Sequence, residues 1–599
     1  MNSAVKRERA HGGLLESCPA GPAEAAVKRE EGSGARRTEG EEAMSLHLKE
    51  RRDLGGGKNV VANGKGNGRG RVEEPAGAGA KRKPRSRERS NQDEFAEVLN
   101  PLRQSIIYLG WILMMAIGHI RDFLDSVGDV VLRRRAEALE GGAGAIVADA
   151  QDFYSRRLYM RIVDIFNRPI SSAPGSWIDV MERERTGDPC RTHPTCTGRT
   201  IRCLNLGSYN YLGLGGNDPY CTPKVIRTLR ECGPSTCSAS AAGGTLDKHV
   251  AMEATVARFL GCESAFVYGM GFATNSNTIP LLAGKGTLII SDEFNHKSIV
   301  DGVRLSGASV KVFKHNNMAH LEWLLRHAIV EGHPRTHRPW RKIVIIVEGI
   351  YSMEGEMVKL RDIVRLKKKY KAYLYLDEAH SIGALGRTGR GVCEQLGVAV
   401  SDIDIMMGTF TKSFGSCGGY IAGPKALVEY VRHASPASYY ATAMSPSAVQ
   451  QIISSLQVIA GWDGSGRGEE KLVRLKENSN YFRRALKQRG FHVLGDEDSP
   501  VVPVMTYYAA KIPALSRLCL EKNLAVVLVG FPATALVLSR MRICISAAHS
   551  LEELRLAVEL LDKIGDKCMI KYSRKDGKQK RRKITPPGGM TDIRGLKFG

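Results

Sequence analysis

Short apolar runs recur along the chain from about residue 200 onward, and most of them end in Gly, Asp or Asn. Helical stretches such as 318–329 and 360–370 separate most of these runs. Continuous apolar runs of this length are typical of parallel strands that are buried on both faces. We therefore expect an α/β large domain over residues 205–455, with a mainly parallel sheet of seven strands. The expected strands are 265–268, 287–290, 310–313, 343–347, 372–376, 405–407 and 420–422.

The pattern changes near residue 455. A predicted helix over 470–488 precedes three predicted strands, and a last helix over 551–564 follows them. This order indicates a smaller C-terminal α+β domain over 456–570. Residues 151–204, ahead of the large domain, are expected to form a helical or linker segment. The three strands of the smaller domain are expected near 501–507, 525–529 and 541–546.

One apolar segment, residues 105–120, lies within an otherwise charged part of the chain. The segment contains no Asp, Glu, Lys or Arg, and His119 is its only basic side chain. Arg103 and Arg121 flank the segment. A membrane-spanning helix needs about 20 apolar residues, so the segment is slightly short. It could span with its arginines reaching the interface, lie in the interface, or form a buried core helix. Because it follows a charged extension, we expect residues 93–150 to hold a membrane anchor and a linker.

The formal net charge of +24 is unevenly distributed. Residues 1–92 are rich in Lys, Arg, Glu, Gly and Ala, and a basic run at 575–583 lies in the tail 571–599. Such segments bury little apolar surface, so both are predicted to be disordered basic extensions. Solvated chain is one interpretation of them, and attraction to anionic lipid headgroups is another. Nucleic acid is not an expected partner, since no zinc-ligand spacing or RNA-binding signature accompanies the charge.

The thirteen cysteines follow no framework pattern, and the chain starts without an apolar signal segment. Both features indicate reduced thiols that face the cytosol. Cys190, Cys196 and Cys203 form a loose cluster, but it contains no Cys-x-x-Cys pair. A metal site is therefore not expected.

Two polar residues at the ends of predicted strands suggest a specific chemistry. Asp377 ends the run 372–376, and Lys412 follows the run 405–407 among several glycines. An enzyme that uses pyridoxal phosphate holds this cofactor as a Schiff base on a lysine. It also needs a carboxylate beside the pyridine nitrogen, which keeps the ring protonated. The pair predicts such an enzyme, although a helix cap for Asp377 and a solvent-exposed Lys412 are the structural alternatives.

A glycine-rich turn at 269–271 leads into a predicted helix. Backbone N–H groups at such a turn bind anions, so Gly271 and Phe272 are candidate donors to the cofactor phosphate. Thr409 could add a hydroxyl group to the same cradle, and its alternative is a turn or cap.

Two histidines also follow predicted strands. His380 comes three residues after Asp377 and could reach the ring hydroxyl, unless it is a satisfied structural histidine. His296 could stack on the face of the pyridine ring. The carboxyl ends of several strands thus offer polar groups to one crevice, where ligands bind in open α/β sheets.

Longer strings from about residue 97 to 573 resemble the α-oxoamine synthase family of fold-type I pyridoxal phosphate enzymes. Within it, they are most similar to the catalytic long-chain-base subunits of serine palmitoyltransferase. The strings are His119-Ile-Arg-Asp-Phe-Leu, Asp152-Phe-Tyr-Ser-Arg-Arg-Leu-Tyr-Met-Arg-Ile, Asn205-Leu-Gly-Ser-Tyr-Asn-Tyr-Leu-Gly, Gly271-Phe-Ala-Thr-Asn-Ser, Val347-Glu-Gly-Ile-Tyr-Ser-Met-Glu-Gly, Gly408-Thr-Phe-Thr-Lys-Ser-Phe-Gly and Val529-Gly-Phe-Pro-Ala-Thr.

The resemblance assigns roles to the ring-side residues. Lys412 resembles the Schiff-base lysine, Asp377 the partner of the pyridinium nitrogen, and His380 the residue near the ring hydroxyl. His296 resembles the imidazole that stacks on the ring and helps to hold the substrate carboxylate.

The resemblance also covers the phosphate and the substrate. Thr409, with the backbone of Gly271 and Phe272, is similar to the phosphate cradle. Arg542 is similar to the arginine that binds the amino-acid carboxylate. Less specific matches are Asn210 on the substrate side and Ser352 on the ring side.

The implied reaction is the decarboxylative condensation of L-serine with a long-chain acyl-CoA to 3-ketodihydrosphingosine. The resemblance further implies a heterodimer with a related non-catalytic subunit, small membrane regulators, and an endoplasmic reticulum membrane with the catalytic domain in the cytosol. The alternatives are a 5-aminolevulinate or 2-amino-3-ketobutyrate type of synthase, and a catalytically silent scaffold subunit.

Two positions depart from the family pattern. Cys237-Ser-Ala-Ser240 stands where the family usually reads Cys-Ser-Thr-Arg, which puts acyl-CoA or partner contacts there in doubt. Lys297 replaces the usual alanine after His296 and adds a cation beside the site.

Overall fold

The computed structural model describes residues 101–131, 153, 155–187 and 192–572. The predicted basic extensions lie outside these residues, except for 571 and 572, and so does most of the predicted linker that ends at 150. The domain boundaries proposed from the sequence at 204/205 and 455/456 stay predictions.

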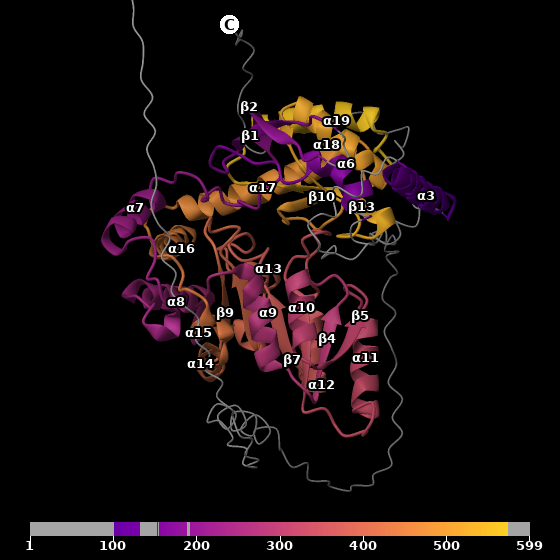
Figure 1. The fold of residues 1–599 in the computed structure, drawn as a ribbon. Coiled ribbons are helices and arrows are strands. Elements are labelled where there is room, and N and C mark those ends of the chain that lie inside the picture. Colours follow the sequence, from indigo (N-terminus) through magenta and orange to yellow (C-terminus); the bar gives the residue numbers. More distant parts are fainter. Residues whose placement is uncertain (1–100, 132–152, 154, 188–191, 573–599) are drawn as a thin grey trace, which may run out of the picture. The chain divides into compact units, whose positions relative to one another are not determined.

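A seven-stranded sheet forms the centre of the large domain, with the strand order β3-β9-β8-β7-β6-β4-β5 (Figure 1). Only β9 runs against its neighbours, so the prediction of a mainly parallel sheet is confirmed. The strands are β3 (Ser264–Tyr268), β4 (Thr287–Asp292), β5 (Ser309–Phe313), β6 (Lys342–Glu348), β7 (Tyr373–Asp377), β8 (Ile405–Thr409) and β9 (Gly419–Gly423).

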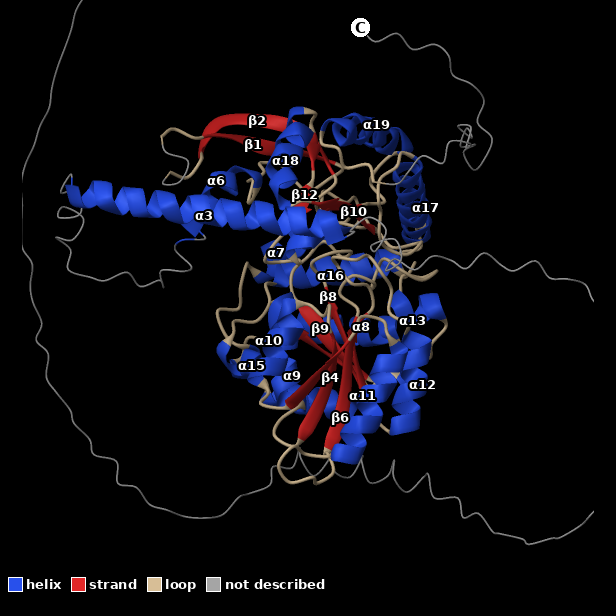
Figure 2. Cartoon of the chain, turned by 90° about the vertical axis from the view of Figure 1, so that its right-hand side faces the viewer, coloured by secondary structure: helices blue, strands red, loops and turns tan. Residues whose placement is uncertain are grey.

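Helices cover both faces of this sheet, and Figure 2 shows the sheet nearly edge on between them. One face packs on α9 (Gly271–Leu282), α10 (Lys297–Leu305) and α14 (Lys425–Ala434). The other face packs on α8 (Asp247–Leu260), α11 (Met318–Glu331), α12 (Leu360–Tyr370), α13 (Gly391–Leu396) and α16 (Pro446–Ile459). Burial on both faces explains why the strands read as continuous apolar runs. Two further helices of this domain are α7 (Cys221–Cys232) and α15 (Pro436–Tyr440).

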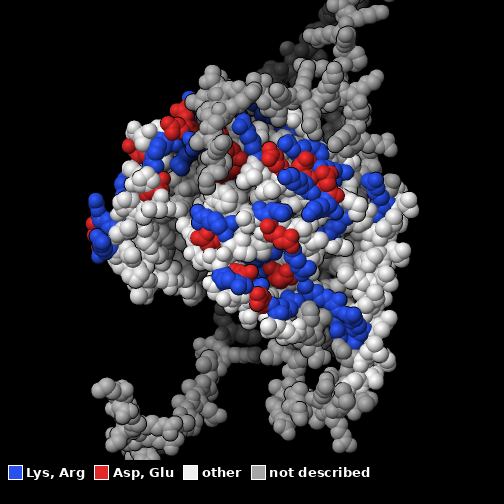
Figure 3. All heavy atoms as spheres, turned by 90° about the horizontal axis from the view of Figure 1, so that it is seen from above, with Lys and Arg blue, Asp and Glu red and all other residues white. Residues whose placement is uncertain are grey.

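The small domain is built on an antiparallel sheet with the order β10-β13-β12. Its strands are β10 (Val501–Tyr507), β12 (Val527–Val529) and β13 (Ser539–Cys544). They share a second apolar core with α17 (Arg467–Gln488), α18 (Ile512–Glu521) and α19 (Leu551–Lys567). The predicted single strand 525–529 is wrong, because β11 (Leu524–Ala525) and β12 belong to different sheets. On the upper face of the molecule, Lys and Arg side chains lie interspersed with Asp and Glu (Figure 3).

The secondary structure described within residues 151–204 differs from the helical or linker segment that we predicted. A long strand pair, β1 (Trp177–Glu184) and β2 (Thr195–Asn205), occupies much of them, and β2 also pairs with β11. Only short helical pieces precede it, among them α6 (Met160–Ile162). Ile178 and Val180 are buried against Cys203, and Asp179 between them is only half-buried. This period of two is the signature of a strand with one wet face, which a search for continuous apolar runs overlooks.

The predicted apolar segment lies within a longer helix, α3 (Pro101–Val131). One side of α3 packs on the small domain: Ile107 joins a buried cluster, and the Trp111 ring lies 5.7 Å from the Phe531 ring. Further along, His119 stacks on Phe153 at 4.0 Å. The part Pro101–Leu124 is long and apolar enough to cross a membrane by length and composition. Most of its large apolar side chains are exposed.

Candidate active site

Five strands of the large sheet direct polar residues to the same edge. Strands β3, β8, β7, β6 and β4 all run in one direction, so their carboxyl ends lie together. The residues proposed from the sequence follow these ends: Gly271 and Phe272 after β3, His296 after β4, Ser352 after β6, Asp377 and His380 at β7, and Thr409 and Lys412 at β8. The fold therefore brings the predicted large-domain residues to one crevice.

Asp377 lies at the base of this crevice and is 3% exposed. Its Oδ2 accepts a hydrogen bond of 2.8 Å from the Asn275 side chain, and its Oδ1 accepts one of 2.9 Å from the Ala379 backbone. Asn275 is itself fixed by the Tyr375 hydroxyl, which donates to its Oδ1 at 2.7 Å. Asn275 was missed as a site residue, although it lies in one of the strings that carry the resemblance. These bonds hold the carboxylate in one orientation while leaving lone pairs for another donor.

Lys412 is half-buried just beyond β8. Desolvation lowers its pKa to about 8, against the opposing pull of the Asp377 and Glu348 carboxylates. Its Nζ lies 5.5 Å from the centroid of the Tyr209 ring. A lysine with this pKa is partly neutral near pH 7.5, which a nucleophilic amine requires.

Gly271 is the first residue of α9, and it lies directly beside Thr409. A Cβ atom at Gly271 would meet the Thr409 Oγ1 at 2.7 Å, so the close approach requires glycine. The Thr409 hydroxyl donates to the Gly418 carbonyl at 2.9 Å and lies 2.9 Å from the Thr411 hydroxyl. Phe272 follows with a side chain that is 41% exposed. The helix N-terminus and the threonine hydroxyls together form a cradle suited to an anion.

His380 is fully enclosed beside Asp377. Its Nδ1 lies 2.8 Å from the Tyr211 hydroxyl, and the Tyr209 ring meets it edge-on at 5.1 Å. Burial, with smaller contributions from nearby cations, lowers its pKa well below the usual value. The ring is therefore neutral at physiological pH and can hold one hydrogen bond at each nitrogen.

His296 caps the N-terminus of α10 on the open side of the crevice. Its Nδ1 lies 2.8 Å from the Ser298 hydroxyl, which fixes the ring orientation. Loss of hydration lowers its pKa, and the Lys412 cation acts in the same direction while Asp377 opposes them. The edge of the Phe272 ring lies near it, with the centroids 6.1 Å apart.

Glu348 is a second buried carboxyl group that sequence reasoning missed. It ends β6 and lies in register with Asp377 on β7, and it accepts a hydrogen bond from the His296 backbone. Burial, and then repulsion by Asp377, raise its pKa well above the usual value. No spacing in the sequence indicates this pair, since it depends on the register between two strands.

The small domain contributes Arg542 from β13. Its guanidinium lies 4.6 Å above the Tyr209 ring, and its Nη1 lies 4.0 Å from the Met353 sulfur. The Arg542 Nε is buried, and no described residue is its hydrogen-bond partner. Tyr209 thus contacts Lys412, His380 and Arg542, and it was missed because Asn210 was chosen from the same string.

The sequence and the fold match known proteins. Residues 201–561 match the family model for aminotransferases of class I and II. Long chain base biosynthesis protein 2b of Arabidopsis thaliana is 57% identical over 78% of this chain and 94% of its own length. Serine palmitoyltransferase 3 of Homo sapiens is 50% identical over 78% of this chain and 85% of its own length. The chain belongs to the class I and II aminotransferase family, in the group of these long-chain-base proteins.

Solved members of the family have the same fold. A structure of Sphingomonas wittichii serine palmitoyltransferase superposes with a TM-score of 0.60 at 27% identity, and it covers 74% of this chain and 98% of its own. A high-resolution structure of SPT with the PLP internal aldimine gives the same TM-score at 26% identity, over 74% of this chain and 99% of its own. Pyridoxal phosphate is the cofactor of this group.

The crevice fits that cofactor. The space that a Cβ at Gly271 would fill lies against the Thr409 hydroxyl, as a bound phosphate requires. Lys412 presents an amine of lowered pKa, and Asp377 presents a fixed carboxylate. The cradle, the amine and the carboxylate come from the ends of separate strands at one edge of the sheet, so a single planar ligand can contact all three.

Two weaker assignments have different surroundings. Ser352 is buried near the end of β6. The Asn210 side chain donates to the Pro174 carbonyl at 2.8 Å and accepts from the Gly215 backbone at 3.0 Å. Asn210 thus holds its own loop in this structure, and its substrate role stays a prediction.

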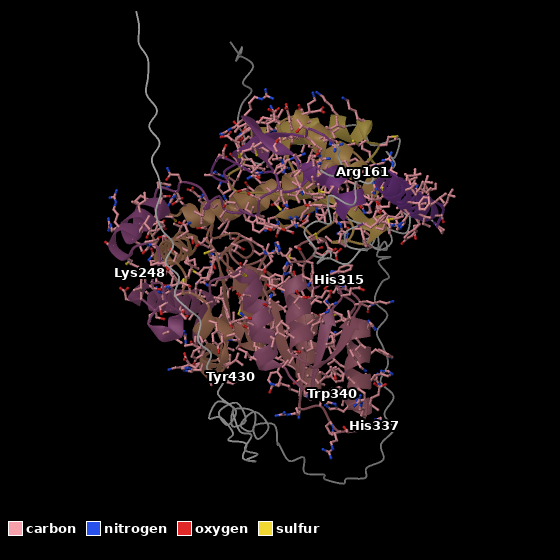
Figure 4. The ribbon with its side chains drawn as sticks, in the orientation of Figure 1. Arg161, Lys248, His315, His337, Trp340 and Tyr430 are labelled. Carbon is pink, nitrogen blue, oxygen red and sulfur yellow. The ribbon has the colours of Figure 1, made fainter. Side chains whose placement is uncertain are left out.

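A buried ionic cluster lies beside the crevice. His315, labelled in Figure 4, is its central residue. It contacts Asp292 at 2.9 Å and Glu356 at 3.4 Å, and these carboxylates raise its pKa to about 10 against the effect of burial. Within the described residues, no group of three or more His, Cys, Asp or Glu side chains is placed to hold a metal ion. Cys190 lies outside those residues. We therefore interpret His315 as a structural cation.

The two departures from the family pattern lie at the surface. Lys297, the first residue of α10, forms an ion pair with Asp301 one turn later, which offsets its charge. Ser240 begins a short 3-10 helix, Ser240–Ala242, and Ala239 bridges to Thr442.

Proposed function

We propose that this chain is the catalytic subunit of a serine palmitoyltransferase. The reaction joins the α-carbon of L-serine to the acyl carbon of palmitoyl-CoA. It releases CoA and carbon dioxide and yields 3-ketodihydrosphingosine, in the first step of sphingolipid synthesis. The observation that carries the proposal is the convergence of Lys412, His380 and Arg542 around Tyr209 in a chain so similar to the long-chain-base proteins.

The large domain would hold the cofactor. Lys412 would hold it through its aldehyde carbon, Asp377 would be the partner of the protonated ring nitrogen, and His380 would be the residue near the ring hydroxyl. Gly271, Phe272 and Thr409, which lie at the ends of their strands, would bind the phosphate. Ser352 would lie on the ring side. When bound, pyridoxal phosphate supplies an electron sink for the pair released at the substrate α-carbon.

Arg542 would bind the serine carboxylate. Its buried Nε has no partner among the described residues, so a carboxylate can accept from this nitrogen without displacing another bond. Stacking on Tyr209 keeps the guanidinium plane in place. This orientation presents the amino group and the α-hydrogen of serine to Lys412.

Lys412 would also move the substrate proton. A pKa of about 8 lets the amine accept a proton from the α-carbon and return it later in the cycle. His296 is neutral at pH 7, and it can donate a hydrogen bond to the substrate from Nε2 while Ser298 holds Nδ1. We assign proton transfer to Lys412, and substrate orientation and acid assistance to His296.

We further propose that α3 attaches the enzyme to the endoplasmic reticulum membrane, with the catalytic domain in the cytosol. The exposed apolar side chains of α3 support this attachment. A membrane location suits the reaction, because the acyl donor and the product both partition into lipid.

The active form would be a heterodimer with a related non-catalytic subunit, joined by small membrane regulators. Exposed apolar side chains near the mouth of the crevice support a partner there, because clustered apolar surface is usually covered. They are Met270, Phe272 and Phe294.

The experiment is to purify the chain with its partner subunit and supply serine with acyl-CoAs of different lengths. We expect an absorption band at roughly 420 nm from the lysine-bound cofactor, and a long-chain ketone product identified by mass spectrometry. Absence of the band would refute the cofactor assignment. Use of acetyl- or succinyl-CoA in place of palmitoyl-CoA would refute the sphingolipid assignment.

A further inference from the structure

A cavity of 590 Å³ lies between α3 and the small domain. Four parts of the chain form its walls. They are α3, residues 157–166, the start of α18, and the segment 528–533, which begins within β12. Its volume is within the range of roughly 300–1,000 Å³ that is typical of ligand sites. None of the proposed active-site residues lines it.

The cavity is mostly apolar, and it is continuous with the exposed side of α3. Trp111, Met114 and Ile117 form its α3 wall, and Phe531 faces them from the small domain. Met114, Ile117 and Phe531 are all at least 40% exposed. A hydrocarbon chain that leaves a bilayer beside α3 could enter here without crossing a polar surface.

Three arginines line the same cavity: Arg121, Arg157 and Arg161. Arg157 forms an ion pair with Asp122, whereas the buried Nε of Arg161, a residue labelled in Figure 4, has no hydrogen-bond partner in the part of the chain that the structure describes. The lining residues that the structure describes include no Asp or Glu. A buried guanidinium donor without an acceptor is unfavourable, so an anionic group bound at this end of the cavity would supply the missing acceptor.

The cavity is also linked to the active-site wall. Leu528 and Val529 line it, and their strand pairs with β13 through Leu528 to Met541 and Val529 to Arg540. Arg542 lies two residues after Arg540 on β13. An occupant of the cavity therefore contacts the strand that neighbours the proposed carboxylate-binding arginine.

We infer that this cavity is a binding site for an anionic phospholipid, with an acyl chain against the α3 wall and the head-group phosphate on Arg161 and Arg121. The inference rests on the proposed membrane attachment through α3, and it does not depend on the proposed catalysis. An apolar cavity with an excess of guanidinium groups matches an amphiphile that has one apolar and one anionic end.

Fluorescence quenching of Trp111 tests the inference in detergent-solubilised protein that carries its partner subunit. Phosphatidylserine and phosphatidylcholine with brominated chains are added to mixed micelles at equal mole fractions. A difference between wild type and Trp111→Phe isolates this tryptophan from the other four of the chain. We expect phosphatidylserine to quench Trp111 at least about threefold more strongly than phosphatidylcholine, because only it offers net negative charge to the arginines.

Two variants test the site itself. Arg161→Gln should abolish the preference for phosphatidylserine, while Arg103→Gln, the same change on α3 but outside the lining, should keep it. Ala533→Phe, which fills the cavity from its wall, should reduce quenching by both lipids. A thermal unfolding midpoint close to wild type confirms that each variant is folded.

Three outcomes would overturn the inference. They are equal quenching by the two lipids, an undiminished preference in Arg161→Gln, and displacement of the lipid by stoichiometric palmitoyl-CoA, which would make the cavity an acyl-donor site. Lys412→Ala should quench like wild type, so failure of the proposed catalysis and failure of the lipid site give different results.

Discussion

The two domains contribute to the active site in different ways. On the large-domain side, Asp377 is nearly inaccessible, and both of its oxygens already accept hydrogen bonds from the protein. On the small-domain side, Arg542 is held by stacking on Tyr209, and its Nε lacks a partner. The difference indicates that the groups for the cofactor are oriented in advance, whereas the group for the substrate carboxylate is completed only when an anion binds.

The largest effect is expected from Lys412→Ala on the large-domain side. The variant loses both the cofactor linkage and the group that moves the α-proton, so activity should fall by roughly 10⁴-fold or more. Condensation assays and the visible spectrum measure the two losses together. A variant that keeps the absorption band would show that another lysine holds the cofactor.

Asp377→Asn removes the charge that stabilises the protonated ring nitrogen while keeping the size of the side chain. Loss of one such electrostatic contact costs on the order of 10²–10³-fold in kcat. Steady-state kinetics checks the value, with Asp179→Asn as the control, since that carboxylate pairs with Arg202 at the surface. A kcat within threefold of wild type would contradict the assignment.

On the small-domain side, Arg542→Lys tests the substrate contact. It should raise the KM for serine roughly 10- to 100-fold, because a guanidinium presents two parallel donors that lysine cannot reproduce.

Arg540 provides the matched control for Arg542 on the same strand. It is buried in an ion pair with Glu354 at 3.0 Å. Arg540→Met should therefore lower the free energy of unfolding by about 3–5 kcal/mol without a comparable rise in the serine KM. If Arg540→Met mainly raises the serine KM and Arg542→Lys mainly lowers the free energy of unfolding, the comparison between the domains is wrong.

The lowered pKa of Lys412 predicts how the cofactor-free enzyme captures pyridoxal phosphate. The neutral amine is the nucleophile, so the rate should rise roughly tenfold per pH unit below pH 8 and level off above it. Stopped-flow absorbance measures the rate from pH 6 to 9.5. A midpoint near the usual lysine pKa would mean that Lys412 is not desolvated as described.

The smallest effect is expected from Lys297→Ala, which restores the usual family residue. Its ion pair with Asp301 is exposed and spans one helical turn, so stability should change by about 0.5 kcal/mol or less. Thermal unfolding checks this value. A large loss of stability would show that Lys297 has contacts beyond that pair.

The large sheet was predictable because most of its strands are short apolar runs buried on both faces; the edge strand β5, with Val310 and Val312 exposed, is the exception. The polar residues after those runs were predictable for a related reason: parallel strands bring their carboxyl ends to one edge, whatever their order in the sheet. Strand β1 was not found, since its buried residues Ile178 and Val180 alternate with half-buried ones, and β2 was not found, since most of it is exposed and only its last three residues are buried. The division of 525–529 depends on pairing with distant strands, which local pattern does not encode.

The contacts within the site were less predictable than its members. Glu348 meets Asp377 only through strand register, and Asn275 reaches Asp377 from a helix a hundred residues earlier. Tyr209 joins the two domains through its ring face and edge. It lies in one of the strings that carry the resemblance, but nothing in that string distinguishes it from its neighbours. Such relations follow from tertiary packing, whereas residue type and position at a strand end follow from sequence.

Release of labelled carbon dioxide from carboxyl-labelled serine tests the central claim most directly. The reaction breaks the bond between the serine α-carbon and its carboxyl group as the new carbon–carbon bond replaces it. We predict release that requires palmitoyl-CoA, equals the ketone product in amount, and is lost in Lys412→Ala. Release without an acyl-CoA, or none from the assembled enzyme with both substrates, would contradict the account.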